Sequence, residues 1–130
     1  MSQLDQVGDG IYRISMFNPQ IGITFNQFLI DDERPALIHT GTHPMFDDVH
    51  KAISKMLDPA KLQFVIVPHF EADECGGMER FLSEAPGSVL VASELGAGVN
   101  LAHWNYRGPV KGMRDGTALE IGRLRRARFV

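Results

Sequence analysis

The stretch VPHFEADECGG, residues 67–77, overlaps the end of the apolar run FVIV at residues 64–67 and places His69, Glu71 and Asp73 at every second position. An apolar run without alternation is typical of a strand that is buried on both faces, as in a parallel sheet. Ligands of such sheets bind outside the carboxyl ends of the strands, because the loops diverge there. The sequence therefore predicts a buried strand that ends in a functional loop.

Side chains at period two share one face if the loop stays extended. On that geometry we expect His69, Glu71 and Asp73 to project together, with Phe70 and Ala72 pointing back into the protein. Two carboxylates ~5 Å apart repel by ~3 kcal/mol at an effective dielectric of ~20. A partly buried pair must then protonate, accept hydrogen bonds from amides or bind a cation. With an imidazole beside them, the carboxylates suit iron or manganese at least as well as zinc.

The same residues have a second interpretation, as the polar start of a helix. Asp73 would then be the N-cap, and the helix dipole would stabilise Glu71 and Glu74. His69 would be a hydrogen-bonded residue at the end of the strand. Spacing alone does not choose between a metal site and a helix cap.

Composition indicates one globular domain. The chain has 130 residues, 44% of them hydrophobic, and a net charge of −3, so it has no overall positive field to attract nucleic acid. It has one cysteine, its first ten residues lack the pattern of a secretory signal, and no apolar run approaches the ~20 residues of a membrane span. We expect a cytoplasmic protein with neither nucleic-acid nor membrane partners. The basic run RLRRAR at 123–128 favours a solvated edge strand over a binding arm.

Short β-rich runs come first along the chain, and an alternation of strands and helices follows. GIYRISMF, TFNQFLIDD and ALIHTG indicate a β-meander, with the charged turn DDERP at residues 31–35 joining the last two. From His43 to Pro59 the apolar period is that of a helix. The later alternation implies parallel neighbouring strands. Its elements are LQFVIVPH, ECGGMERFLSEA, SVLVAS and ELGAGVNLAHW, followed by a hairpin of DGTALEIG and LRRARFV.

In this setting, HFEADECGG after a buried strand, preceded by NQFLIDDERPALIHTGTH, resembles the metallo-β-lactamase fold and, within it, the flavodiiron group with its H-x-E-x-D signature. The resemblance covers nearly all of the chain. It implies an α+β fold of the αββα metallo-β-lactamase type, in which a β-meander and βαβ units form a mixed sheet flanked by helices. Residues 1–130 are expected to form a single, incomplete domain that corresponds to the N-terminal half of that fold.

The resemblance also implies a metal centre. His69 and Glu71 correspond to ligands of one iron, and Asp73 corresponds to a ligand of its neighbour, so two iron ions are the expected cofactor, with zinc as the alternative. The implied activity is the binding of dioxygen, or the reduction of dioxygen or nitric oxide. The chain has no flavodoxin-like domain, so the electrons are expected from a separate protein.

The chain departs from the family pattern at three points. Glu74 stands where the wider fold often has a histidine, and His39 stands where relatives usually carry an aspartate. The remaining ligands of the family lie in a second half of the fold, beyond the 57 residues that follow Asp73. Two alternatives therefore stay open. One is a zinc-dependent hydrolase of thioesters or lactones, against which Glu71 argues, and the other is a non-catalytic half-fold that acts as a homo-oligomer or with a complementing chain.

The other histidines and the cysteine have simpler interpretations. His43 is expected at a helix start, His50 on the polar side of a helix, and His103 in local packing beside Trp104. Cys75 lacks a resolving cysteine and a nearby basic residue, so we expect a small buried side chain rather than a redox-active thiol.

Overall fold

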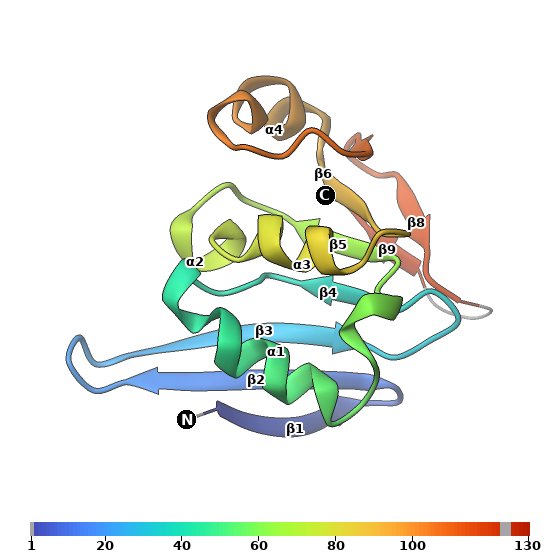
Figure 1. Cartoon of the computed structure of the whole chain (residues 1–130). Helices are drawn as coiled ribbons and strands as arrows, with labels where there is room; N and C mark the ends of the chain where they lie inside the picture. The colour runs from blue at the N-terminus through green and yellow to red at the C-terminus, as the bar shows by residue number, and fades with distance from the viewer. Residues whose placement is uncertain (1, 123–125) are drawn as a thin grey trace.

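The computed structural model describes residues 2–122 and 126–130. Its main element is a seven-stranded sheet whose strands follow one another in sequence order (Figure 1). The first four strands pair antiparallel and the last four pair parallel, so the sheet is mixed, as the sequence predicts. The strands are β1 (Ser2–Gly8), β2 (Ile11–Asn18), β3 (Ile23–Ile30), β4 (Ala36–Ile38), β5 (Phe64–Val67), β6 (Val89–Ser93) and β7 (Val110–Met113).

Helices pack on one face of this sheet. α1 (Phe46–Ser54) lies over the meander, while α2 (Ala72–Cys75) and α3 (Met78–Glu84) lie beside the parallel strands (Figure 1). α4 (Glu94–Val99) connects β6 to β7 at the edge of the sheet. The main core lies between the helices and the strands. It includes Ile14, Leu29, Leu37, Val65 and Leu90 from the sheet, and Val49, Ile53, Met78 and Phe81 from the helices.

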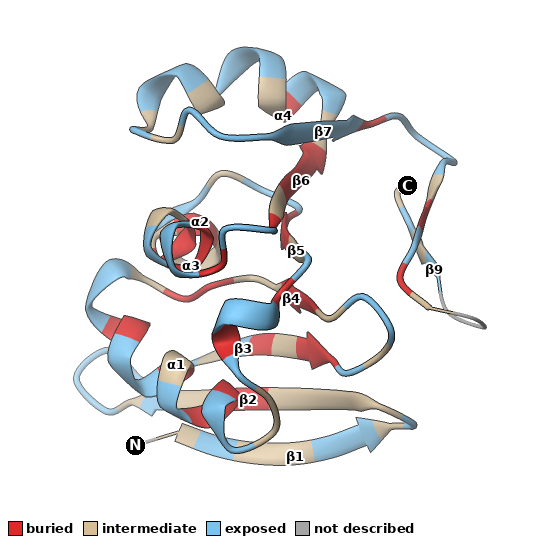
Figure 2. Ribbon diagram, turned by 45° about the vertical axis from the view of Figure 1, so that its right-hand side comes forward, coloured by how far each residue is buried: buried red, intermediate tan, exposed pale blue. Residues whose placement is uncertain are grey.

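A smaller layer packs on the opposite face. The hairpin of β8 (Ala118–Glu120) and β9 (Arg126–Arg128) lies on the side of the sheet away from α2 and α3 (Figure 2). It forms a second apolar cluster, in which Leu119 and Ile121 join Ile66 and Val91 of the sheet. The predicted terminal hairpin is therefore confirmed.

The sequence analysis did not predict two of the strands, β1 and β7. Residues 2–8, predicted to be a polar lead, form β1, because their backbone pairs with β2 and Leu4 faces the core opposite Ile14. β7 is exposed at three of its four positions, so no apolar pattern marks it, and it joins the sheet through its backbone.

Two further predictions need adjustment. The first helix ends at Ser54 rather than at Pro59, and Met56 lies in the turn that follows. Within the basic run, residues 123–125 lie outside the described residues, and Arg126–Arg128 form a strand with exposed arginines. None of the helices in residues 2–122 and 126–130 has both the length and the apolar character needed to span a bilayer.

Candidate metal centre

The candidate site begins where β5 ends. The last three residues of the FVIV run are buried, which fixes the end of the strand in the core. His69 and Glu71 lie in the loop that leaves this end, with 71% and 62% of their side chains exposed. Nδ1 of His69 lies 3.1 Å from Oε1 of Glu71, within hydrogen-bonding distance. The loop thus presents an imidazole and a carboxylate, paired with each other and open to solvent.

The loop does not stay extended through residue 73, so the condition for aligning His69, Glu71 and Asp73 by alternation is not met. The helix α2 starts at Ala72, and Asp73 lies in its first turn. Glu74 takes its place, because His69, Glu71 and Glu74 each offer a ligand atom and these atoms lie within 4.8 Å of one another. Phe70 packs against the main core as expected, whereas Ala72 is exposed rather than inward.

The helix-cap interpretation also fails for Asp73. The N-cap of α2 is Glu71, and no side-chain hydrogen bond caps this helix. Asp73 and Glu74 both lie in its first turn, where negative charge is favoured by the helix dipole. The role of Asp73 as a ligand of a second metal remains a prediction.

The position of Glu74 is set by the segment that follows β4. The backbone oxygen of Glu74 accepts a hydrogen bond from the N–H of Thr40 at 2.7 Å and lies 3.0 Å from the Thr40 hydroxyl. The same hydroxyl accepts a hydrogen bond from the N–H of Gly77 at 2.9 Å. Thr40 is fully buried. α2 and the glycine pair behind it are therefore tied to the end of β4.

The pair Gly76–Gly77 explains why one predicted helix over ECGGMERFLSEA is two. A Cβ on Gly76 would lie 2.6 Å from the backbone nitrogen of His43, and one on Gly77 would lie 3.4 Å from the Thr40 hydroxyl. Without side chains, the segment between α2 and α3 packs directly against the backbone of residues 40–43. The absence of a side chain at Gly76 therefore permits the close approach of this segment to the backbone of His43.

The Glu74 carboxylate is bound on one side only. Its Oε1 lies 3.9 Å from Nδ1 of His39, a distance that gives an ion pair when the imidazole is protonated. Its Oε2 is buried without a hydrogen-bond partner among the residues that the structure describes. Buried carboxylate oxygens normally have partners, so this oxygen is available to a ligand that the chain itself does not supply.

Cys75 is buried, and its thiol donates to the backbone oxygen of Glu71 at 3.0 Å. Burial, followed by the negative charges of Glu74 and Asp73, raises the pKa of Cys75 from 9.0 to about 11. The thiol therefore stays protonated at neutral pH. This agrees with the prediction of a buried structural side chain.

The remaining histidines are His43, His50 and His103. His43 starts the short 3-10 turn before α1, as predicted for a helix start. His50 pairs with Glu84 at 2.9 Å. His103 is exposed and lines a surface hollow with Trp104 and with Phe70 of the metal loop, so its local packing beside Trp104 stays a prediction. In the part of the chain that the structure describes, none of the three belongs to a group of potential metal ligands.

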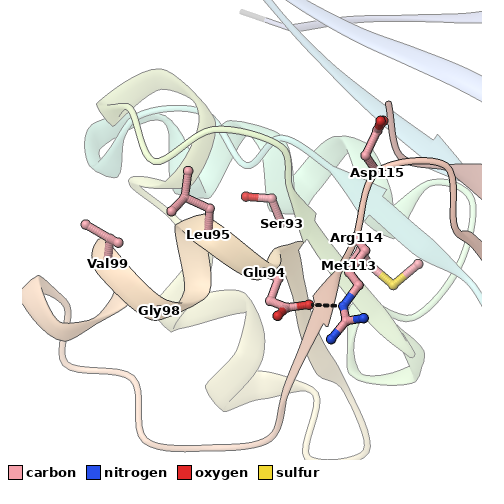
Figure 3. Close-up of a pocket in the computed structure, with 8 residues that line it drawn as sticks. All are labelled: Ser93, Glu94, Leu95, Gly98, Val99, Met113, Arg114 and Asp115. Carbon is pink, nitrogen blue, oxygen red and sulfur yellow. Dashed lines mark hydrogen bonds and ion pairs between the residues drawn. The ribbon is translucent and has the colours of Figure 1, made fainter.

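Two cavities flank α4. One of about 230 Å³ lies beside His69 and Phe70, and its far wall includes Ser93 and Leu95. A wider hollow of about 670 Å³ lies between α4 and β7, where Glu94 and Arg114 point toward each other (Figure 3). None of the residues that line this wider hollow belongs to the loop after β5, whereas His69 and Phe70 of that loop line the smaller cavity.

The donor set fits part of an iron site. It combines one imidazole nitrogen with carboxylate oxygens and has an unpartnered buried oxygen on Glu74. Nitrogen and oxygen donors without a thiolate suit iron and manganese. The buried thiol of Cys75, held in its protonated form, is directed to a backbone oxygen rather than to the site.

The fold and this loop define a metallo-β-lactamase-like domain with a candidate metal centre at the end of β5. Residues 23–130 match the family described as "ODP family beta lactamase", and the chain belongs to this family.

Similar proteins include enzymes named for gas chemistry. Rubredoxin-oxygen oxidoreductase from Megalodesulfovibrio gigas is 25% identical over 104 residues, which cover 79% of this chain and 26% of that protein. Nitric oxide reductase from Moorella thermoacetica is 25% identical over 118 residues, which cover 82% of this chain and 30% of that protein.

Solved structures confirm the predicted fold. The rubredoxin oxygen:oxidoreductase from Desulfovibrio gigas matches 92% of this chain and 33% of its own with a TM-score of 0.84 and 22% identity. The flavodiiron protein from Giardia intestinalis matches 92% of this chain and 32% of its own with a TM-score of 0.82 and 18% identity. The chain thus spans about a third or less of the length of these relatives.

Proposed function

We propose that the chain forms part of a flavodiiron-like non-haem diiron domain that binds dioxygen, or reduces dioxygen or nitric oxide. The observation that carries this proposal is the loop after β5. There, potential ligand atoms of His69, Glu71 and Glu74 gather within 4.8 Å of one another in a member of the ODP family. The names of two similar proteins, an oxygen oxidoreductase and a nitric oxide reductase, support a diatomic gas as the substrate.

In this proposal His69 and Glu71 hold one iron, and Asp73 holds its neighbour. A bound iron pair supplies coordination positions for a gas molecule and the capacity to pass electrons to it. The chain itself holds the ligand loop in position and leaves the site accessible to solvent. The buried end of β5 and the Thr40 contacts fix the loop, and the high exposure of His69 and Glu71 leaves the site open to a small ligand.

We also propose that the remaining ligands come from polypeptide outside these 130 residues. His103 is the only histidine after Asp73, and it lines a hollow with Trp104 instead of joining the cluster. A further part of the same protein, a second copy or a complementing chain would supply the missing ligands. An electron donor outside these 130 residues would reduce the centre.

Metal analysis of the purified chain, without added metal, is the most direct test. After anaerobic reconstitution with ferrous iron, we expect iron to be retained and the near-ultraviolet spectrum to change on exposure to air. Loss of all iron during desalting, together with an unchanged spectrum, would refute the proposal.

The same samples test the alternatives. Zinc in the protein together with turnover of a thioester or lactone would favour the hydrolase, in which a metal-bound hydroxide attacks a carbonyl. A metal-free oligomer in light scattering would favour a non-catalytic half-fold.

A further inference from the structure

We infer that Glu74 is a metal ligand in this chain and that His39 is the residue that positions its carboxylate. The inference rests on the proposed metal site and deepens it. In this inference, Glu71 and Glu74 both donate carboxylate oxygens to the metal that His69 binds. This arrangement gives one divalent cation two negative charges and a neutral nitrogen within a single loop.

The geometry of α2 brings Glu74 to the site. Residues three apart lie on the same side of a helix, so Glu74 falls on the side of Glu71, and their potential ligand atoms lie within 4.8 Å of each other. Glu74 is also fixed from behind, because its backbone oxygen is held by both the N–H and the hydroxyl of the buried Thr40. The carboxylate is therefore placed by a rigid backbone.

The state of the Glu74 carboxylate points independently to a cation. Only 17% of the side chain is exposed, and Oε2 is buried without a partner among the described residues. A carboxylate that is withdrawn from water needs hydrogen bonds, a proton or a positive charge. Oε1 lies beside His39, whereas Oε2 has no partner. A cation bound between Glu74, His69 and Glu71 would give Oε2 the positive charge that it lacks.

His39 is held in a conformation that ordinary side chains avoid. Its φ is 65°, and it is the one non-glycine residue with a positive φ in residues 2–122 and 126–130. The strained backbone is retained by a hydrogen bond from the His39 N–H to the oxygen of Ile66 at 3.1 Å, next to the end of β5. In this position the imidazole lies beside Glu74. Strain of this kind is often found where a side chain must be held for function.

Titration of the chain with Co²⁺, followed by absorption spectroscopy, tests the inference without any activity assay. The variants are Glu74→Gln, Asp73→Asn and His39→Asn, with Glu33→Gln in the exposed turn before β4 as the matched control. Asparagine tolerates a positive φ, so His39→Asn removes the imidazole and spares the backbone. Circular dichroism checks that each variant is folded.

We expect Glu74→Gln to weaken Co²⁺ binding at least tenfold and to change the visible spectrum, and His39→Asn to weaken binding severalfold. Glu33→Gln should bind Co²⁺ as the wild type does, and Asp73→Asn, which changes the proposed ligand of the neighbouring metal, should weaken the second equivalent. Binding by Glu74→Gln within twofold of the wild type would overturn the ligand role. An unchanged affinity of His39→Asn would overturn the positioning role.

The outcomes also separate this inference from the proposed function. A loss of binding in Asp73→Asn with normal binding in Glu74→Gln would refute the role of Glu74 and leave the family's metal site standing. A wild-type chain that binds no Co²⁺ would refute both. If Glu74→Gln is unfolded, Glu74→Asp keeps the charge and withdraws the carboxylate by one methylene, and wild-type affinity in that variant would refute the ligand role.

Discussion

The backbone oxygen of Glu74 lies 2.7 Å from the N–H of Thr40 and 3.0 Å from its hydroxyl, so one buried threonine holds the carbonyl of a candidate ligand twice. The two residues are 34 positions apart in sequence. Through this contact, the segment after β4 and the helix after β5 become one unit. The geometry of the metal loop therefore depends on a buried threonine that lies outside the cluster of potential ligands.

Thr40→Val tests this link. The valine removes the hydroxyl that accepts a hydrogen bond from the N–H of Gly77 and lies 3.0 Å from the oxygen of Glu74, and it leaves the Gly77 N–H only its longer bond to the oxygen of Gly41 at 3.2 Å. A hydrogen bond contributes about 0.5–1.5 kcal/mol, and we expect the free energy of unfolding, measured with urea, to fall by about that amount. Thr24→Val in the exposed part of β3 is the matched control and should leave the stability nearly unchanged. Equal stability of the two variants would contradict the structural role of Thr40.

Gly76→Ala tests the close approach behind α2. The new Cβ would lie 2.5 Å from the oxygen of Ala72 and 2.6 Å from the nitrogen of His43, and both are backbone atoms that cannot swing away. We expect a loss of about 2 kcal/mol or more in stability, because overpacking forces the backbone to shift. Gly98→Ala, where nothing lies within 4 Å of the added Cβ, should instead stabilise α4 by up to ~1 kcal/mol. A similar effect of both substitutions would refute the contact.

The buried thiol makes stability depend on pH in the alkaline range. The pKa of Cys75 is raised from 9.0 to about 11 in the folded protein, chiefly by burial. The unfolded chain therefore loses its thiol proton first, which stabilises the unfolded state as the pH rises from about 9 to 11. We expect the stability of the wild type to fall more steeply over this range than that of Cys75→Ala. Parallel pH profiles of the two proteins would show that the thiol is not perturbed.

Much of the fold could be predicted, because burial leaves a pattern in the sequence. β5 and β6 are covered on both faces and appear as uninterrupted apolar runs, and α1 shows a helical period. β1 and β7 could not be predicted in the same way. They lie at the two edges of the sheet, and they are held by backbone pairing that side-chain patterns do not record.

The sequence predicted where the candidate site begins, but not how the chain continues after Glu71. The end of β5 gave the position of His69 and Glu71, but the alternation rule assumed that the chain stayed extended beyond them. The helix begins at Ala72, and the relevant spacing is therefore three rather than two. The spacing of Glu71 and Glu74 is compatible with this, since residues three apart share one side of a helix.

His69→Asn is the simplest test of the metal centre itself. Asparagine removes the imidazole nitrogen and retains a polar side chain at a position that is 71% exposed, so the fold should be unaffected. We expect the retention of reconstituted iron, measured by metal analysis after desalting, to fall at least tenfold, because the imidazole is the one nitrogen donor in the cluster. His103→Asn makes the same chemical change beside Trp104 and should retain iron as the wild type does. If both variants lose iron equally, the metal does not bind at the end of β5. If neither does, the iron is held without His69.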